Sequence, residues 1–201
     1  MKAKQGILIE ELLHITRHAI TSAEAFKELS EKDLNFKKDP GQWSILECLE
    51  HLNLYGDFYL PEMEKQLLQG PPSNRDRVFK SGIIGNYFAN LMKIDHGKIK
   101  KMKSPKDKNP INSKLSVLVI DRFLKQAEKL ILLLNMAGKV DLTKTKASIS
   151  LTKLIKLRMG DTFRFYVYHI DRHILQAQKN VKSIHNEEQS ILHEPLRRIV
   201  Q

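Results

Sequence analysis

The sequence predicts an all-α protein in which four long helices pack together as a four-helix bundle. Apolar residues recur at three- and four-residue steps along most of the chain, which is the period of an amphipathic helix. Four of these segments are long enough for bundle helices, whose ligand sites form where side chains of facing helices converge. The 201 residues contain no internal repeat and no domain boundary, so we expect a single domain over residues 1–201.

The first two long helices are expected over residues 7–29 and 43–69. The Lys-Asp-Pro-Gly turn at residues 38–41 separates them, because proline and glycine together favour a turn. Pro61 lacks the amide donor that a helix interior needs, so it should kink or restart the second helix. Gly70, followed by two prolines, should end that helix.

Residues 75–110 have the least regular pattern in the chain. A short helix is expected over residues 85–92, where apolar residues cluster. Residues 93–108 contain seven lysines and two aspartates, and we expect them to form a long loop. The third long helix is expected over residues 116–136, with Gly138 as its C-terminal cap.

The remaining part of the chain should contain one extended segment and the fourth long helix. Alternating β-branched residues at 143–155 predict a short extended piece. The fourth helix is expected over residues 161–181, and Asp161 or Thr162 is placed to cap its first turn. The polar tail beyond Ser183 is expected to pack loosely.

The composition argues against a membrane protein and against a disulfide-stabilised one. Hydrophobic residues make up 41% of the chain, and no apolar run approaches the roughly 18 to 20 residues that a transmembrane helix needs. The N-terminus turns acidic after three apolar residues, so it lacks the apolar core of a secretory signal. Cys48 is the single cysteine and cannot form an intramolecular disulfide. We therefore expect a cytoplasmic protein without a membrane partner.

The net charge of +11 is compatible with nucleic acid, a membrane surface or an acidic small molecule as a partner. Much of the excess positive charge lies between Lys93 and Lys108. That segment contains no arginine and no aromatic residue that would stack on a base. A solvated, Lys-rich connector is therefore favoured over a nucleic-acid surface, while a weak attraction to phosphate stays open.

Two histidine pairs share a four-residue spacing but occupy different faces of their helices. His169 and His173 lie about 100° and 60° from the centre of the apolar stripe of the fourth helix, at its edge. His14 and His18 lie about 140° to 180° from the stripe of the first helix. We therefore expect His14 and His18 to face solvent, and His169 and His173 to face the region where neighbouring helices meet.

The second helix offers a third histidine, His51, about 90° from the centre of its apolar stripe. Three neutral imidazoles from two helices suit Zn, Ni or Fe(II) and leave coordination positions for water or a substrate. The same pattern also fits three separate histidines at helix edges, each hydrogen-bonded to a carbonyl group. The residues alone leave both interpretations open.

Trp43 and Cys48 lie close to His51 in the sequence. Trp43 is expected to be a packing anchor at the start of the second helix, with stacking on a substrate as the alternative. Cys48 precedes His51 by one turn and lies inside the apolar stripe. It is therefore expected to be a buried structural thiol and not a fourth metal ligand.

Several other polar residues near the histidines have no assigned role. Glu47 and Asp57 are carboxylates within six residues of the histidine of the second helix, and either one is a candidate to orient an imidazole or to act as a base. Their spacing is not specific, so the catalytic residues are unknown. Asp171 and Arg172 are expected to point away from the core, and Gln176 to line a cavity.

Two tracts of the sequence resemble the signatures of the DinB/YfiT-like superfamily. The first is DLNFKKDPGQWSILECLEHLNLYGDFY at residues 33–59, where Trp-Ser leads eight residues later into His-Leu. The second is GDTFRFYVYHIDRHILQ at residues 160–176, with a Gly-Asp opening, an H-x-x-x-H motif and a nearby glutamine. Both tracts occur in the order and separation of the family, and together they span most of the chain.

The resemblance implies a four-helix bundle with a long crossover connection, which often forms a homodimer. It also implies a divalent metal, typically nickel or zinc, held by His51, His169 and His173, and iron is a further possibility for this ligand set. The Lys-rich insertion at residues 93–108 is longer than a minimal family member needs, so the resemblance gives no role for it.

The resemblance allows more than one activity. Some family members resemble thiol S-transferases, which use a low-molecular-weight thiol such as bacillithiol or mycothiol together with a small-molecule substrate. Others resemble metal-dependent hydrolases. The alternative is a non-catalytic, stress-associated binding bundle in which the metal site is structural or vestigial. A nucleic-acid-associated protein that uses the lysines of residues 93–108 is the least favoured hypothesis.

Overall fold

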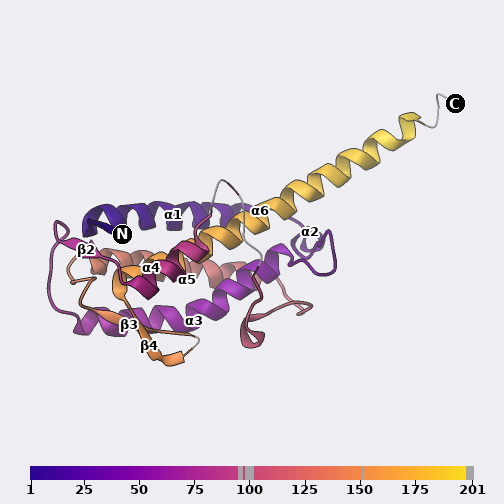
Figure 1. Ribbon diagram of the computed structural model, residues 1–201. Coiled ribbons are helices and arrows are strands. Elements are labelled where there is room, and N and C mark those ends of the chain that lie inside the picture. The colour runs from indigo at the N-terminus through magenta and orange to yellow at the C-terminus, as the bar shows by residue number, and fades with distance from the viewer. Residues whose placement is uncertain (95–96, 98–101, 151, 198–201) are drawn as a thin grey trace.

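Four long helices form the core of the protein, whose computed structural model is shown in Figure 1. They are α1 (Gln5–Phe26), α3 (Ile45–Gln69), α5 (Leu118–Ala137) and α6 (Met159–Arg197). Helices α1 and α3 each pack against both α5 and α6, so the four helices surround one continuous apolar core. This arrangement confirms the predicted all-α four-helix bundle.

The structure describes residues 1–94, 97, 102–150 and 152–197 of the chain. For these residues it also describes the surroundings of the side chains, except at residue 153 and at residues 187–197. Six residues of the Lys-rich segment, 95–96 and 98–101, lie outside the described part. The expectation of a loop is therefore testable only for the rest of that segment.

Helix α3 has well-defined ends that match the sequence pattern. Ser44 caps its N-terminus in a reciprocal capping box with Glu47, whose carboxylate accepts from the Ser44 backbone amide. The helix therefore starts at Ile45, two residues after the predicted start. It continues through Pro61 without restarting and ends at Gly70, as predicted.

Helix α6 differs from its prediction at both ends. It starts at Met159, so Asp161 and Thr162 lie in its first turn and do not cap it. The helix runs to Arg197, although an end near residue 181 was predicted. The last buried apolar residue described on this helix is Ile184. Figure 1 shows this last part of α6 projecting beyond the other helices. The packing of its side chains from residue 187 lies outside the described part.

The long connection from α3 to α5 contains β2 (Val78–Lys80), α4 (Ile83–Met92) and the 3-10 turn η1 (Lys106–Lys108). Strand β2 pairs antiparallel with β1 (Lys2–Lys4) at the N-terminus. Helix α4 packs against α6 on the outside of the bundle. The predicted short helix at 85–92 is therefore present and begins two residues earlier.

The extended piece predicted at residues 143–155 contains the first strand and the start of the second strand of a β-hairpin. Strands β3 (Lys146–Ile149) and β4 (Thr152–Arg158) pair antiparallel, with Lys146 opposite Arg158. The hairpin leads directly into α6 and packs against α3. A further short helix, α2 (Glu31–Leu34), lies between α1 and α3.

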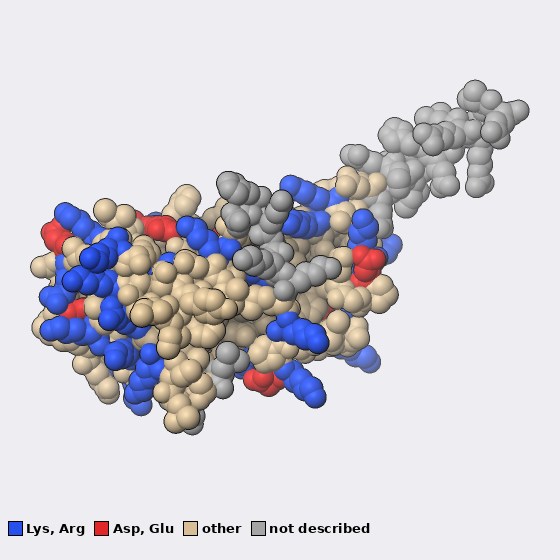
Figure 2. Space-filling view, viewed as in Figure 1, with Lys and Arg blue, Asp and Glu red and all other residues tan. Residues whose placement is uncertain are grey.

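The described helices include none that is both long and apolar enough to cross a membrane. On the face shown in Figure 2, Lys and Arg side chains are spread over the surface and gather at the end that carries β2, with few Asp or Glu between them. The positive charge of the chain is therefore not confined to the Lys-rich segment.

Candidate metal centre

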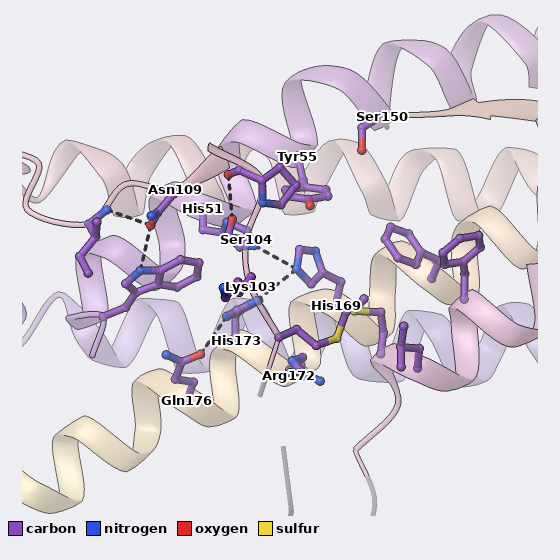
Figure 3. Close-up of a pocket in the computed structure, with 18 of the residues that line it drawn as sticks. His51, Tyr55, Lys103, Ser104, Asn109, Ser150, His169, Arg172, His173 and Gln176 are labelled. Carbon is purple, nitrogen blue, oxygen red and sulfur yellow. Dashed lines mark hydrogen bonds between the residues drawn. The ribbon is translucent and has the colours of Figure 1, made fainter. Parts of the chain in front are cut away.

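His51 of α3 and His169 and His173 of α6 converge on one point between the two helices (Figure 3). The Nε2 atom of His169 lies 3.1 Å from Nε2 of His51 and 3.1 Å from Nε2 of His173. All three side chains are buried, with at most 7% of any residue exposed. The structure therefore brings together the three histidines that the sequence singled out.

The ring of His51 is oriented by the segment that follows the Lys-rich residues. Its Nδ1 lies 2.5 Å from the backbone carbonyl oxygen of Lys108. A carbonyl can only accept a hydrogen bond, so Nδ1 carries the proton and Nε2 keeps its lone pair. The side chain of Lys108 donates to the carbonyl of Leu54, and Ser104 Oγ donates to the same Lys108 carbonyl, so this segment is held against α3.

His173 is oriented in the same way by its own helix. Its Nδ1 lies 3.1 Å from Oε1 of Gln176, one turn further along α6. The amide oxygen accepts from Nδ1–H, which again leaves Nε2 as the unprotonated nitrogen. Two imidazole lone pairs therefore face the Nε2 of His169.

The Nε2 atoms of the three histidines form a set of donors that suits a cation. Either His169 shares one Nε2 proton between two acceptors, or a positive ion lies among the three nitrogens. In the described part of the chain, the buried Nδ1 of His169 has no hydrogen-bond partner in either arrangement. Three neutral nitrogen donors from imidazole rings are a common ligand set for Zn²⁺ and similar ions.

Burial keeps these imidazoles neutral. It lowers the pKa of His51 to about 4, against a smaller opposing effect of the hydrogen bond to the Lys108 carbonyl. Burial also lowers the pKa of His169 and of His173 well below the usual value, and the neighbouring rings and the charge of Arg172 add to the effect. All three rings are therefore neutral near pH 7, and the neutral ring is the form that binds a metal.

Two aromatic side chains enclose the histidines. The ring of Trp43 lies 4.6 Å from that of His51 and 5.5 Å from that of His173, centre to centre. Tyr55 contacts the rings of His51 and His169 at 4.9 and 4.6 Å. Trp43 therefore packs directly on the site, and its indole N–H donates to Oδ1 of Asn109.

The three histidines form part of the wall of a cavity of about 850 Å³. Its walls come from α3, α4, α6, the β3–β4 hairpin and residues 102–111. Gln176 lines the cavity as predicted. Figure 3 shows Lys103, Ser104 and Asn109 of the connecting segment near the histidines. A small molecule that enters this space meets the histidine nitrogens.

The orientation predicted for Arg172 is wrong. This residue is only 6% exposed and lines the cavity beside the histidines. Residue 172 is three positions after His169, so the two side chains lie on the same side of α6. Asp171 is half-buried, and burial raises the pKa of its carboxyl group.

Neither carboxylate near His51 in the sequence contacts its ring. Besides its part in the α3 cap, Glu47 accepts from Lys37 Nζ at 2.7 Å. Asp57 pairs with Arg122 and accepts from Gln126. Both carboxylates therefore have structural partners.

The remaining expectations for cysteine and the other histidines agree with the structure. Cys48 is fully buried, and burial raises the pKa of its thiol, as expected for a structural residue. His14 and His18 are exposed on α1. The shared four-residue spacing therefore has different consequences in α1 and in α6.

Sequence reasoning missed two groups that contact the histidines. The Lys108 carbonyl is a backbone atom in a segment expected to be a solvated connector. Tyr55 was not among the residues that the sequence singled out. The pattern of side chains contained no signal for the carbonyl, whereas the position of Tyr55 one turn after His51 did indicate proximity.

One comparison with known proteins identifies a family. The family model described as DinB superfamily matches residues 13–177, which is most of the chain. Searches of the curated proteins and of the solved structures returned no match. The matched range contains both α3 and the part of α6 that carries the histidine pair. The chain therefore belongs to the DinB superfamily.

Proposed function

We propose that the protein is a divalent-metal-dependent enzyme whose ion is held by His51, His169 and His173. The observation that carries the proposal is the convergence of three Nε2 atoms, two of them left unprotonated by hydrogen bonds at Nδ1. Zinc and nickel are the ions expected first for three imidazole ligands, and Fe(II) also suits them.

The surroundings of the site favour catalysis over a purely structural ion. Structural zinc sites usually have four protein ligands, whereas catalytic sites keep a position open. Among the described residues, the group of possible ligands contains three histidines and no cysteine or carboxylate. The site also borders a cavity large enough for a small molecule.

When bound, a divalent ion would supply Lewis-acid chemistry, which lowers the pKa of water or of a thiol. The protein would orient His51 through the Lys108 carbonyl and His173 through Gln176. Trp43 and Tyr55 would restrict water around the rings. Transfer of a low-molecular-weight thiol to an electrophile, or hydrolysis, fits these features.

Elemental analysis of the purified protein tests the metal site. We expect about one divalent ion per chain, and a loss of at least about tenfold in metal affinity in His51→Ala, His169→Ala and His173→Ala. His14→Ala and His18→Ala are matched controls, because this exposed pair has the same spacing and should leave the metal content unchanged. If all five variants bind the same amount of metal, the ligand assignment is wrong.

The catalytic part of the proposal needs a separate measurement. The metal-loaded protein is incubated with a thiol and an electrophile, and in parallel with ester and amide substrates. Activity that disappears in His169→Ala and persists in His14→Ala would support an enzyme. A metal-loaded protein that is inactive throughout this screen would instead favour the non-catalytic binding bundle.

A further inference from the structure

The cavity has two chemically different ends, and α6 provides a measure of their separation. Phe165 lies one turn before His169 and also lines the cavity, whereas Lys179 lies beyond His173. At 1.5 Å per residue, Phe165 and Lys179 are roughly 21 Å apart along the helix axis. The histidines lie between them, so a ligand that occupies both ends must pass the three Nε2 atoms.

The end near Phe165 is apolar. The ring of Tyr59 of α3 is tilted against that of Phe165, with 5.7 Å between the ring centres. The side chains that complete this wall come from α4 and the β-hairpin, and they are Phe88, Leu91, Met92, Ile149 and Leu157. An alkyl or aromatic group would be removed from water there.

The other end is polar and positively charged. Asn180 donates to the backbone carbonyl of Trp43 at 2.7 Å, which places this end of α6 beside the start of α3. Lys179 lines the cavity and donates only to the neutral carbonyl of Gly97, at 3.2 Å. Lys103 lines the cavity beside the histidines (Figure 3) and has no carboxylate partner among the described residues.

The described residues that line the cavity include three cations and no Asp or Glu. Arg172 adds buried positive charge, but it already has a partner within the protein, so Lys103 and Lys179 are the cations that a ligand can engage. An ion held by three neutral imidazoles would keep its own positive charge as well. The potential in the cavity therefore favours an anion and disfavours a cation.

We infer that the cavity takes an amphipathic anion, a small molecule that joins a carboxylate, phosphate or sulfonate to an apolar portion. The anionic group lies toward Lys103 and Lys179, and the apolar portion lies toward Phe165. The inference rests on the proposed function, because the central part of the ligand is the part that would lie at the three histidines.

Trp43 provides a direct measurement of binding, because it is the single tryptophan of the chain and lines the cavity. Octanoate, 1-octanol and octylammonium are titrated below their micellar concentrations, and Trp43 fluorescence is recorded. These probes share a chain length, which is shorter than the full span of the cavity, and differ in charge, so they compare the charge preference of the site and not its length. We expect octanoate to bind on the order of 10-fold more tightly than octanol, with octylammonium weakest.

Substitution of the two lysines tests the position of the anionic group. In the Lys103→Gln/Lys179→Gln double variant, the affinity for octanoate should fall on the order of 10-fold and approach that for octanol. Lys106→Gln/Lys114→Gln is the matched control, because both lysines are exposed and neither lines the cavity. Equal binding of octanoate and octanol to the natural protein, or an unchanged octanoate affinity in the first double variant, would overturn the inference.

The titration is repeated after dialysis against EDTA and after reloading with Zn²⁺. A preference for octanoate that persists in the EDTA-treated protein supports the lysines, and not coordination by the metal, as its source. A preference that appears only with Zn²⁺ overturns the assignment to Lys103 and Lys179. Metal content is measured on the same samples, so a protein that takes up no Zn²⁺ on reloading and still prefers octanoate contradicts the proposed function alone.

Discussion

At the scale of single residues, the far nitrogens of the imidazole rings determine what the site can bind. A histidine presents a lone pair at Nε2 only if the proton is held at Nδ1. The Lys108 carbonyl holds it in His51, and the Gln176 amide holds it in His173. These two hydrogen-bond acceptors therefore hold two Nε2 atoms in the orientation that a metal needs, even without an ion. This reduces the entropic cost of metal binding.

Replacing Gln176 by leucine should weaken metal binding without unfolding the protein. The change removes the acceptor for His173 Nδ1–H, so the ring loses its fixed tautomer and orientation. We expect the metal dissociation constant to rise about 10- to 100-fold, measured by competition with a chromophoric chelator. Gln178→Leu is the control, since Gln178 lies on the same helix and bonds to Ser22 of α1. Equal affinities in both variants would contradict a role for Gln176 in orienting His173.

Cys48 should be unreactive in the folded protein between pH 7 and pH 9. The thiolate is the nucleophilic form, and burial raises the pKa of this thiol, so the side chain stays protonated in this range. Alkylation by iodoacetamide should be on the order of 100-fold slower in native buffer than in 6 M guanidinium chloride. Rapid labelling of the native protein would show that Cys48 is accessible and contradict its burial.

At the scale of elements, Asp161 attaches α4 to the start of α6. Its carboxylate accepts from the Gly82 amide at the start of α4 and from the Ser81 hydroxyl group. Arg164, only 3% exposed, pairs with the same carboxylate at 3.1 Å. The approach is close, since a Cβ on Gly85 would lie 2.6 Å from Asp161 Cβ. Predicted as a cap of its own helix, Asp161 instead caps a neighbouring one.

Asp161→Ala should destabilise the protein by about 3 kcal/mol, because it leaves the buried Arg164 without its carboxylate partner. The free energy of unfolding is measured by urea titration followed by circular dichroism. Asp121→Ala provides the comparison, since the Asp121–Lys27 pair is partly exposed and should contribute less than about 1 kcal/mol. A similar loss in both variants would show that Asp161 is not an anchor of α4.

At the scale of the whole molecule, the apolar core extends well beyond the metal site. Buried side chains from all four long helices form one cluster, and large members such as Leu8, Leu12 and Phe123 do not line the cavity. The bundle should therefore fold without an ion. A metal that binds the folded protein in preference to the unfolded chain would add to its stability. Folding would not require the metal.

Removal of the metal with EDTA should lower the melting temperature by about 10 °C for free metal at roughly 1,000 times its dissociation constant. The far-ultraviolet circular dichroism at 20 °C should stay unchanged, because the helices retain their packing. His51→Ala should show no further decrease on EDTA treatment. Loss of helical signal upon chelation would instead indicate a structural ion that the fold requires.

The apolar periodicity of the sequence was sufficient to predict the four long helices, because each buries one continuous stripe in the core. It also placed His51, His169 and His173 at stripe edges and His14 and His18 in solvent. The end of α6 was missed, since the sequence beyond Ser183 is mostly polar while the backbone continues as a helix. The homodimer and the cytoplasmic location stay predictions.

The sequence by itself determined which histidines face the interior, because helical spacing fixes the direction of a side chain relative to its own helix. Only the tertiary structure decided that the three rings meet and which nitrogen of His51 is free. The meeting point depends on how α3 packs against α6, and the proton on His51 depends on a backbone carbonyl 57 residues further along the chain. Both depend on contacts between distant segments, which a local pattern of side chains does not encode.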